Sequence, residues 1–166
     1  LQNIIGLWFI QRLMAEWKEE GDEQQYDILL PAAEKAVIDT VIPVDDAAFQ
    51  NPPSMQQAII DYCNAHNLTA PTSKAETTRV VLQSLAAKYA EATSALNAML
   101  PSPIKKLHII GGGSQNKLLN RLTEEALGVP VDAGPVEATG IGNILTQALA
   151  KGEVSDIAEM RRIVKA

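Results

Sequence analysis

The sequence is poor in cysteine, in long apolar runs and in positive charge, and each shortage excludes a class of protein. Cys63 is the only cysteine among 166 residues, so no disulfide forms within the chain, which is consistent with a reducing, cytoplasmic location. No apolar stretch approaches the roughly 20 residues that a membrane-spanning helix needs. The first residues also lack the pattern of a secretory signal peptide, because their apolar patch contains Gln11 and Arg12.

Basic residues are outnumbered, with 14 Lys and Arg against 20 Asp and Glu, which gives a formal net charge of −6. There is no basic block of the kind that neutralises phosphates in nucleic-acid-binding proteins. We therefore expect neither a nucleic acid nor a membrane as a partner. Because the chain begins with Leu1 almost directly on a helical pattern, we expect it to be a fragment of a larger protein.

The most informative stretch is 106–120, Lys-Leu-His-Ile-Ile-Gly-Gly-Gly-Ser-Gln-Asn-Lys-Leu-Leu-Asn. Its apolar run 107–110 predicts a buried strand, and a helix over 115–127 is predicted directly after the glycines. Glycine lets the backbone approach a ligand closely or turn with positive φ, and a helix start offers free N–H groups. The pattern is typical of a nucleotide or phosphate site, and equally of a tight turn that binds nothing.

The glycine turn matches neither of the two best-known phosphate-binding motifs. A dinucleotide fingerprint requires glycine where this chain has Asn116, and the Gly-Lys-Ser/Thr ending of a P-loop is missing. Asn116 is predicted to lie in the first turn of the helix, where its amide could satisfy both donor and acceptor atoms of a base or ribose.

A second glycine element follows the first. A short strand is predicted over 129–132, a turn at 133–135, and a helix that begins at Glu137. Gly140 and Gly142 fall early in this helix, where each glycine costs about 1 kcal/mol relative to alanine. This cost indicates that a sheet or a ligand packs closely there.

The coarse pattern is a set of helices followed by a β-α-β-α unit, which favours an α/β fold. Helices are predicted over 3–20, 22–38, 54–66, 73–99 and 155–166, with Asn3, Ser54, Ser73 and Ser155 as N-caps and a possible strand at 40–43. A buried seam is predicted along 73–99 through Leu82, Leu85, Tyr89, Ala92, Leu96 and Met99. Strands 107–110 and 129–132 are predicted to be parallel neighbours joined by helix 115–127. Two strands make a poor sheet, so further strands are expected from the region 39–53 or from sequence outside the chain.

Few polar residues carry recognisable chemistry. Gln11 is predicted near the buried stripe of its helix, either bonded to backbone or facing a ligand cleft. Trp8 and Trp17 are assigned to the core or to a domain interface, and Cys63 to the core. His66 and His108 have no partner histidine or cysteine at metal-ligand spacing, so neither is assigned to a metal site. The adjacent Asp45 and Asp46 belong either to a solvated loop or to a metal site. We predict no catalytic residue and no metal site in this chain.

The segments 109–120 (Ile-Ile-Gly-Gly-Gly-Ser-Gln-Asn-Lys-Leu-Leu-Asn) and 133–143 (Ala-Gly-Pro-Val-Glu-Ala-Thr-Gly-Ile-Gly-Asn) resemble the C-terminal domain of FGGY carbohydrate kinases. The likeness runs from residue 3 to about 162. It implies an actin-like ATPase fold, in which ATP binds between two RNase-H-like domains. Residues 1–166 would then form a single, helix-rich C-terminal nucleotide-binding domain whose N-terminal sugar and phosphate domain is absent.

The resemblance also implies roles for individual residues. Gly112, Gly113 and Asn116 would line the adenine side of ATP, with Gly111 in the same turn. The position of Gln11 contacts ATP in the family, and the position of Asn3 contacts the sugar.

The resemblance places the other functional groups upstream of Leu1, namely the aspartate base, the phosphate loop and most sugar contacts. The fragment alone is therefore expected to be inactive, with ATP and Mg²⁺ bound by the full-length parent. Within the family, the stretches 3–12 and 79–89 resemble the kinases that act on one particular ketose. The alternatives are a kinase of xylulose, ribulose or fuculose, and an actin-like nucleotide-binding module without sugar chemistry.

Overall fold

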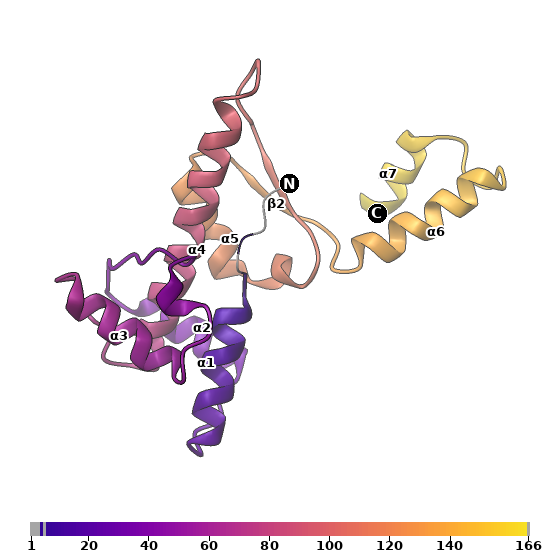
Figure 1. Ribbon diagram of the computed structural model, residues 1–166. Coiled ribbons are helices and arrows are strands. Elements are labelled where there is room, and N and C mark those ends of the chain that lie inside the picture. The colour runs from indigo at the N-terminus through magenta and orange to yellow at the C-terminus, as the bar shows by residue number, and fades with distance from the viewer. Residues whose placement is uncertain (1–3, 5, 166) are drawn as a thin grey trace.

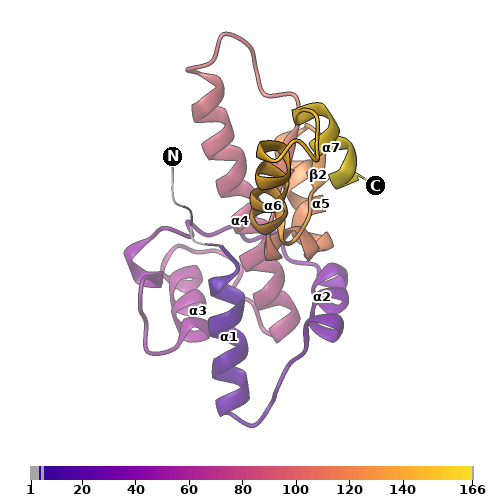
Figure 2. The same ribbon diagram turned by 90° about the vertical axis from the view of Figure 1, so that its right-hand side faces the viewer.

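The computed structural model describes residue 4 and residues 6–165, and in it helices dominate. The elements in chain order are α1 (Trp8–Glu19), α2 (Tyr26–Lys35), the 3-10 turn η1 (Ala47–Phe49), α3 (Met55–Ala65), α4 (Lys74–Asn97), β1 (Leu107–Ile109), the 3-10 turn η2 (Gly112–Gln115), α5 (Lys117–Leu127), β2 (Val131–Ala133), α6 (Ala138–Ala150) and α7 (Ile157–Lys165). The long helix α4 runs through the body, with α1, α2 and α3 around one half of it and α5 beside it (Figures 1 and 2). Among the described residues, no helix has both the length and the apolar character needed to cross a bilayer.

The core lies where α1, α3 and α4 meet. On α1, Phe9, Ile10, Leu13 and Trp17 are fully buried, and their three- and four-residue spacing places them on one helix face. Each such side chain contributes roughly 1.5–3 kcal/mol when it is removed from water. Cys63 is also buried in this cluster, as predicted.

Helix starts follow the side-chain capping rule at two of the three predicted N-caps that the structure describes, since Asn3 lies outside the described residues. Ser54 accepts a hydrogen bond from the backbone N–H of Gln57, and Ser73 accepts one from that of Glu76, so both predicted caps are confirmed. The predicted cap at Ser155 is wrong. The carboxylate of Asp156, one residue later, accepts the hydrogen bond from the N–H of Glu159 at 2.7 Å, and α7 begins directly after it.

The sheet confirms the predicted β-α-β unit. β1 and β2 are parallel neighbours, with Leu107 paired to Val131, and α5 connects them. β2 begins later than predicted, because α5 ends at the left-handed Gly128 and Pro130 has no N–H to offer a ladder. The carbonyl of Pro130 still accepts a hydrogen bond from the N–H of Leu107 at 3.0 Å.

Two predicted helices are shorter in the structure. The helix predicted over 3–20 begins only at Trp8, with Leu7 in the N-cap position and Ile4 and Gly6 outside any helix. Asn3 lies outside the described residues. The helix predicted over 22–38 spans only Tyr26–Lys35, because Gln25 before it and Ala36 after it adopt extended backbone angles.

The possible strand at 40–43 does not form. Its backbone hydrogen bonds go to side chains of α4: the amide of Gln83 donates to the carbonyls of Ile38 and Thr40, and the N–H of Ile42 donates to the hydroxyl of Ser84 at 2.9 Å. These side chains satisfy the backbone groups that a partner strand would otherwise pair.

The predicted seam of α4 is only half correct. Leu82 and Leu85 are buried and Tyr89 packs against the core, but Leu96 is exposed and Met99 is 75% exposed. The C-terminal half of α4 extends beyond the other helices of the body (Figure 1).

The last two helices, α6 and α7, form a hairpin that stands apart from the helical body (Figure 1). A Cβ atom added at Gly140 or Gly142 would meet no atom within 4 Å in the described chain. The described chain, its sheet included, therefore does not pack closely at these glycines, and a ligand as the alternative cause stays a prediction. Close approach occurs instead at Gly134, where an added Cβ would lie 3.0 Å from the Ile110 side chain.

Candidate functional site

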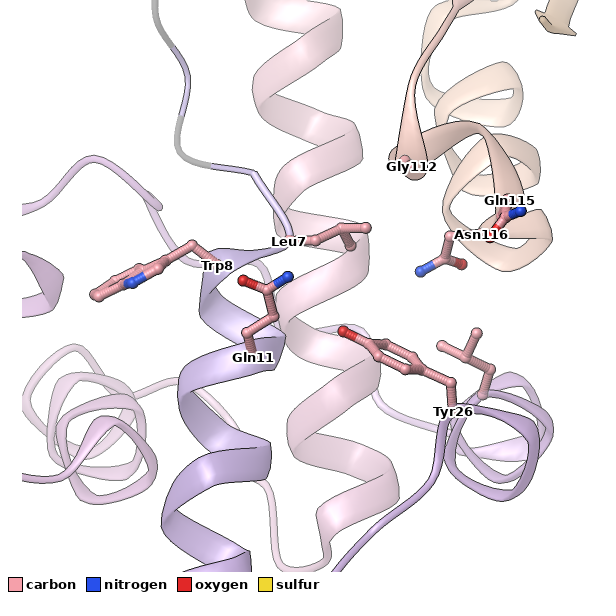
Figure 3. Close-up of a pocket in the computed structure, with 9 residues that line it drawn as sticks. Leu7, Trp8, Gln11, Tyr26, Gly112, Gln115 and Asn116 are labelled. Atoms are coloured by element: carbon pink, nitrogen blue, oxygen red, sulfur yellow. The ribbon is translucent and has the colours of Figure 1, made fainter. Parts of the chain in front are cut away.

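Three segments that are distant in sequence surround a cavity of about 540 Å³. Figure 3 shows α1, α2 and the glycine turn converging on it. The lining residues are Leu7, Trp8 and Gln11 from the start of α1, Tyr26 and Leu30 from α2, and Gly112, Gly113, Gln115 and Asn116 from the turn before α5. None of these side chains carries a charge, so the cavity suits a neutral ligand or the neutral part of a charged one.

The glycine turn is fixed by its own hydrogen bonds. Gly111 has φ +81°, a conformation that glycine adopts readily and other residues avoid. Its carbonyl accepts hydrogen bonds from the hydroxyl of Ser114 at 2.8 Å and from the backbone N–H of the same residue at 3.0 Å. Asn120 on α5 adds a third bond, from its side-chain amide to the carbonyl of Ser114 at 2.8 Å. The turn therefore presents Gly112 and Gly113 to the cavity in a defined position.

The two polar atoms of the Asn116 side chain have different roles, since one caps a helix and the other has no hydrogen-bond partner in the described chain. The side chain is only 5% exposed, and its Oδ1 accepts a hydrogen bond from the N–H of Leu119 at 3.0 Å, which caps α5. Its Nδ2 has no partner in the described part of the chain, and the side chain points into the cavity (Figure 3). A buried donor without a partner costs about 1–3 kcal/mol, so a ligand acceptor at this place would be stabilised. Only the donor remains for a ligand, whereas both amide atoms were predicted to be free.

Gln11 lies at the edge of the cavity and not within the buried stripe. Its side chain is exposed on α1, and its amide makes no hydrogen bond to any described residue. Figure 3 shows it on the α1 side, opposite Asn116. Of the alternatives for Gln11, the structure favours the group that faces a cleft.

The two tryptophans have different environments. Trp17 is fully buried, and its ring N–H donates to the side chain of Gln56, so its assignment to the core is confirmed. Trp8 is 41% exposed and lines the cavity, so it lies outside the core, and the alternative assignment to a domain interface stays a prediction.

The structure brings together Gln11, Gly112, Gly113 and Asn116, which are four of the six predicted site residues. Gly111 shapes the turn without lining the cavity, and Asn3 lies outside the described residues. The lining residues that sequence reasoning missed are Leu7, Trp8, Tyr26, Leu30 and Gln115. Gln115 is adjacent to the glycines and could have been included, but nothing in the sequence of α2 indicates that its first turn reaches the glycine turn.

No metal centre is found among the residues that the structure describes, since no three His, Cys, Asp or Glu side chains gather in one place. His66 stacks on the ring of Tyr62. Asp46 caps η1 through the N–H of Ala48, and Asp45 pairs with Lys88 at 2.8 Å. The hydrogen bond from Lys88 lowers the pKa of Asp45, as expected for a surface carboxylate beside an ammonium group.

Comparison with known proteins relates the chain to one family. Residues 1–151 match the model of the FGGY family of carbohydrate kinases, C-terminal domain. The chain is 40% identical over 164 residues to a rhamnulokinase of Bacteroides thetaiotaomicron and 44% identical over 166 residues to one of Pectobacterium atrosepticum. Each alignment covers 99% of this chain but only 33% and 32% of the respective relative. The chain therefore spans about a third of the length of these relatives.

Proposed function

The chain belongs to the FGGY family of carbohydrate kinases, and from this premise we propose that it is the nucleotide-binding C-terminal domain of an ATP-dependent L-rhamnulose kinase. The parent would transfer the γ-phosphoryl group of ATP to the 1-hydroxyl of L-rhamnulose. The sugar oxygen attacks the γ-phosphorus, the bond to the β–γ bridging oxygen breaks, and ADP leaves. An upstream aspartate would take the hydroxyl proton.

The observation that carries this proposal is the cavity between α1, α2 and the glycine turn. Its volume of about 540 Å³ lies within the range of about 300–1,000 Å³ typical of small-molecule sites. The unpartnered Nδ2 of Asn116 can donate to a ring nitrogen of adenine or to a ribose hydroxyl. The neutral lining suits adenosine, which leaves the triphosphate to extend beyond the cavity.

Within this cavity we assign Gln11, Gly112, Gly113 and Asn116 to the adenosine part of ATP, with Gly111 holding the turn. We assign Asn3 to the sugar on the family resemblance alone. The described residues offer no cluster of carboxylates that fits Mg²⁺, so we place its ligands in the upstream part of the parent. The phosphate loop and the aspartate base belong to that part as well.

The same reasoning supports the two-domain, actin-like architecture of the parent. A sheet of two short parallel strands is marginal by itself, since independent sheets usually have three or more strands. The relatives are about three times as long as this chain, and an upstream segment of that size can supply the missing strands and the second domain.

The alternative sugars are xylulose, ribulose and fuculose. Relatives that are 38–44% identical over nearly the whole chain carry the name rhamnulokinase, which favours L-rhamnulose. An actin-like module without sugar chemistry is disfavoured by the same relatives.

The test is ADP release by the full-length parent with ATP, Mg²⁺ and a panel of ketoses. We expect L-rhamnulose to give the highest kcat/KM, with L-fuculose, L-ribulose and D-xylulose well below it. A clear preference for another ketose would replace the substrate and keep the enzyme class. ATP turnover that no ketose stimulates would favour the module without sugar chemistry.

A further inference from the structure

Tyr26 stands between two cavities. Together with Leu30 and Gln115, it lines both the cavity of about 540 Å³ that we assign to adenosine and a neighbouring cavity of about 260 Å³. The second cavity also contains the charged residues Asp27, Glu34 and Lys117, whereas the first contains none. Tyr26, Leu30 and Gln115 therefore separate a cavity without charged side chains from one that has them.

The ring of Tyr26 makes no ring–ring contact with another described aromatic side chain. It is the first residue of α2, and its hydroxyl makes no hydrogen bond within the described chain. Tyr62 differs, because it stacks on His66 and tilts against Phe49. Burial raises the pKa of the Tyr26 hydroxyl, so the side chain stays neutral at neutral pH.

The ring and the open amide donor line the same cavity and come from different elements. Figure 3 shows Tyr26 reaching from α2 toward Gln11, with Asn116 entering from the glycine turn. A flat ligand can thus place one face on the ring while its edge accepts from Asn116 Nδ2. Purine bases have this shape and carry ring nitrogens at the edge, and base stacking on aromatic side chains is a common recognition mode.

We propose that Tyr26 is the residue that selects a purine nucleotide, its ring forming the wall on which the base stacks. The inference rests on the proposed function, since it names what one residue of the ATP site does. The larger face of a purine gains more from this ring than the smaller face of a pyrimidine. The phosphates lie away from the ring and gain nothing from it.

The experiment measures the binding of ATP, CTP and inorganic tripolyphosphate to the full-length parent by calorimetry. In Tyr26→Leu we expect ATP affinity to fall roughly tenfold, because stacking on an aromatic side chain is worth about 1–3 kcal/mol per base and tenfold equals about 1.4 kcal/mol. CTP affinity should fall less, and tripolyphosphate affinity should not change. Tyr26→Phe keeps the ring and should bind ATP as wild type does.

Ile28→Ala is the matched control, because Ile28 lies on the same helix, is 64% exposed and does not line the cavity. It should leave the binding of all three ligands unchanged. A second measurement needs no destabilising change: with 3-fluorotyrosine incorporated, the ¹⁹F resonance that Tyr26→Phe removes should shift on addition of ATP and not of tripolyphosphate. This measurement decides the matter if Tyr26→Leu fails to fold.

The possible outcomes separate the inference from the proposed function. If wild type binds ATP and Tyr26→Leu binds it equally well, the inference is wrong and the proposed function stands. The inference is also wrong if Tyr26→Leu lowers the affinities for ATP and for tripolyphosphate by the same factor. It is wrong as well if the ¹⁹F resonance of residue 26 does not shift on addition of ATP. If wild type binds no ATP, the proposed function itself fails.

Discussion

Gly111 and Gly113 lie two residues apart in the same turn, yet the backbone restrains only the first. Gly111 has φ +81° and ψ −170°, a region that is essentially limited to glycine, and any other residue there would be strained by about 1–3 kcal/mol. Gly113 has no positive φ, and a Cβ at this position would meet no atom within 4 Å. A Cβ at Gly113 therefore clashes with nothing in the described chain, and because Gly113 lines the cavity, the two glycines are a matched test of binding against folding.

We predict that Gly113→Val in the full-length parent raises the KM for ATP more than the KM for the sugar. The added side chain occupies space that the base needs, while the unfolding temperature stays near that of wild type. Gly111→Ala should show the reverse, a lower unfolding temperature with a smaller effect on the KM for ATP. Steady-state kinetics with thermal melts measure both. Normal ATP binding by a folded Gly113→Val would mean that the turn is only structural.

Asn116 allows its two amide atoms to be tested separately. Asn116→Asp keeps an oxygen that can cap α5 and removes the donor, so we predict unchanged stability and a several-fold loss of ATP affinity, since one hydrogen bond is worth about 0.5–1.5 kcal/mol. Asn116→Ala removes both atoms and should also lower the free energy of unfolding by about 1 kcal/mol. The idea fails if Asn116→Asp binds ATP like wild type.

At the scale of the element, the start of α4 depends on a carboxylate. Glu76 accepts hydrogen bonds from the N–H and the hydroxyl of Thr72, both at 2.7 Å, and these bonds lower its pKa below the usual 4.5. A depressed pKa means that the carboxylate stabilises the fold above pH 4.5 and that this contribution is lost as the pH falls through the lowered value.

We predict that Glu76→Gln lowers the unfolding temperature at pH 7 and that the difference from wild type shrinks below pH 4.5. Glu19→Gln is the control, since Glu19 is exposed at the end of α1 and forms no hydrogen bond with its side chain in the described structure. Thermal unfolding followed by circular dichroism at pH 7 and at pH 3.5 measures the effect. A difference that is the same at both values would rule out a role for the charge.

Local signals predicted most elements and the parallel pairing of β1 with β2, whereas several other contacts between elements were not predicted. Ser54 and Ser73 cap their helices as predicted because a cap depends on residues three positions apart. The glycine turn and Asn116 were found for the same reason. Tyr26 was missed, and the possible strand at 40–43 does not form, because each depends on a partner that is distant in sequence. The partner is the glycine turn in the first case and Gln83 and Ser84 of α4 in the second.

At the scale of the whole molecule, the described chain leaves apolar surface without a partner. A groove of about 470 Å³ lies between α4 and β1, lined by Tyr89, Ala92, Leu107 and Ile109 among others. Ile4 and Gly6 line it as well, so the upstream part of the proposed parent would enter the domain beside this groove. Leu96 in the last turn of α4 and Met99 just beyond the end of this helix add exposed apolar area. Such a surface is typical of a part that packs against the rest of a larger protein.

The last prediction follows from the proposed division of the parent into this domain and an upstream part that holds the base and the phosphate loop. Residues 1–166 produced alone should release no ADP from ATP in the presence of L-rhamnulose, because the proposed base and phosphate loop belong to the upstream part. The cavity residues Gln11, Gly113 and Asn116 position a nucleotide but offer no group that takes a proton from a sugar hydroxyl. The full-length parent, assayed at the same concentration, is the positive control, and circular dichroism checks that the fragment is helical. Ketose-dependent ADP release by the purified fragment would contradict the division and require a base within these residues.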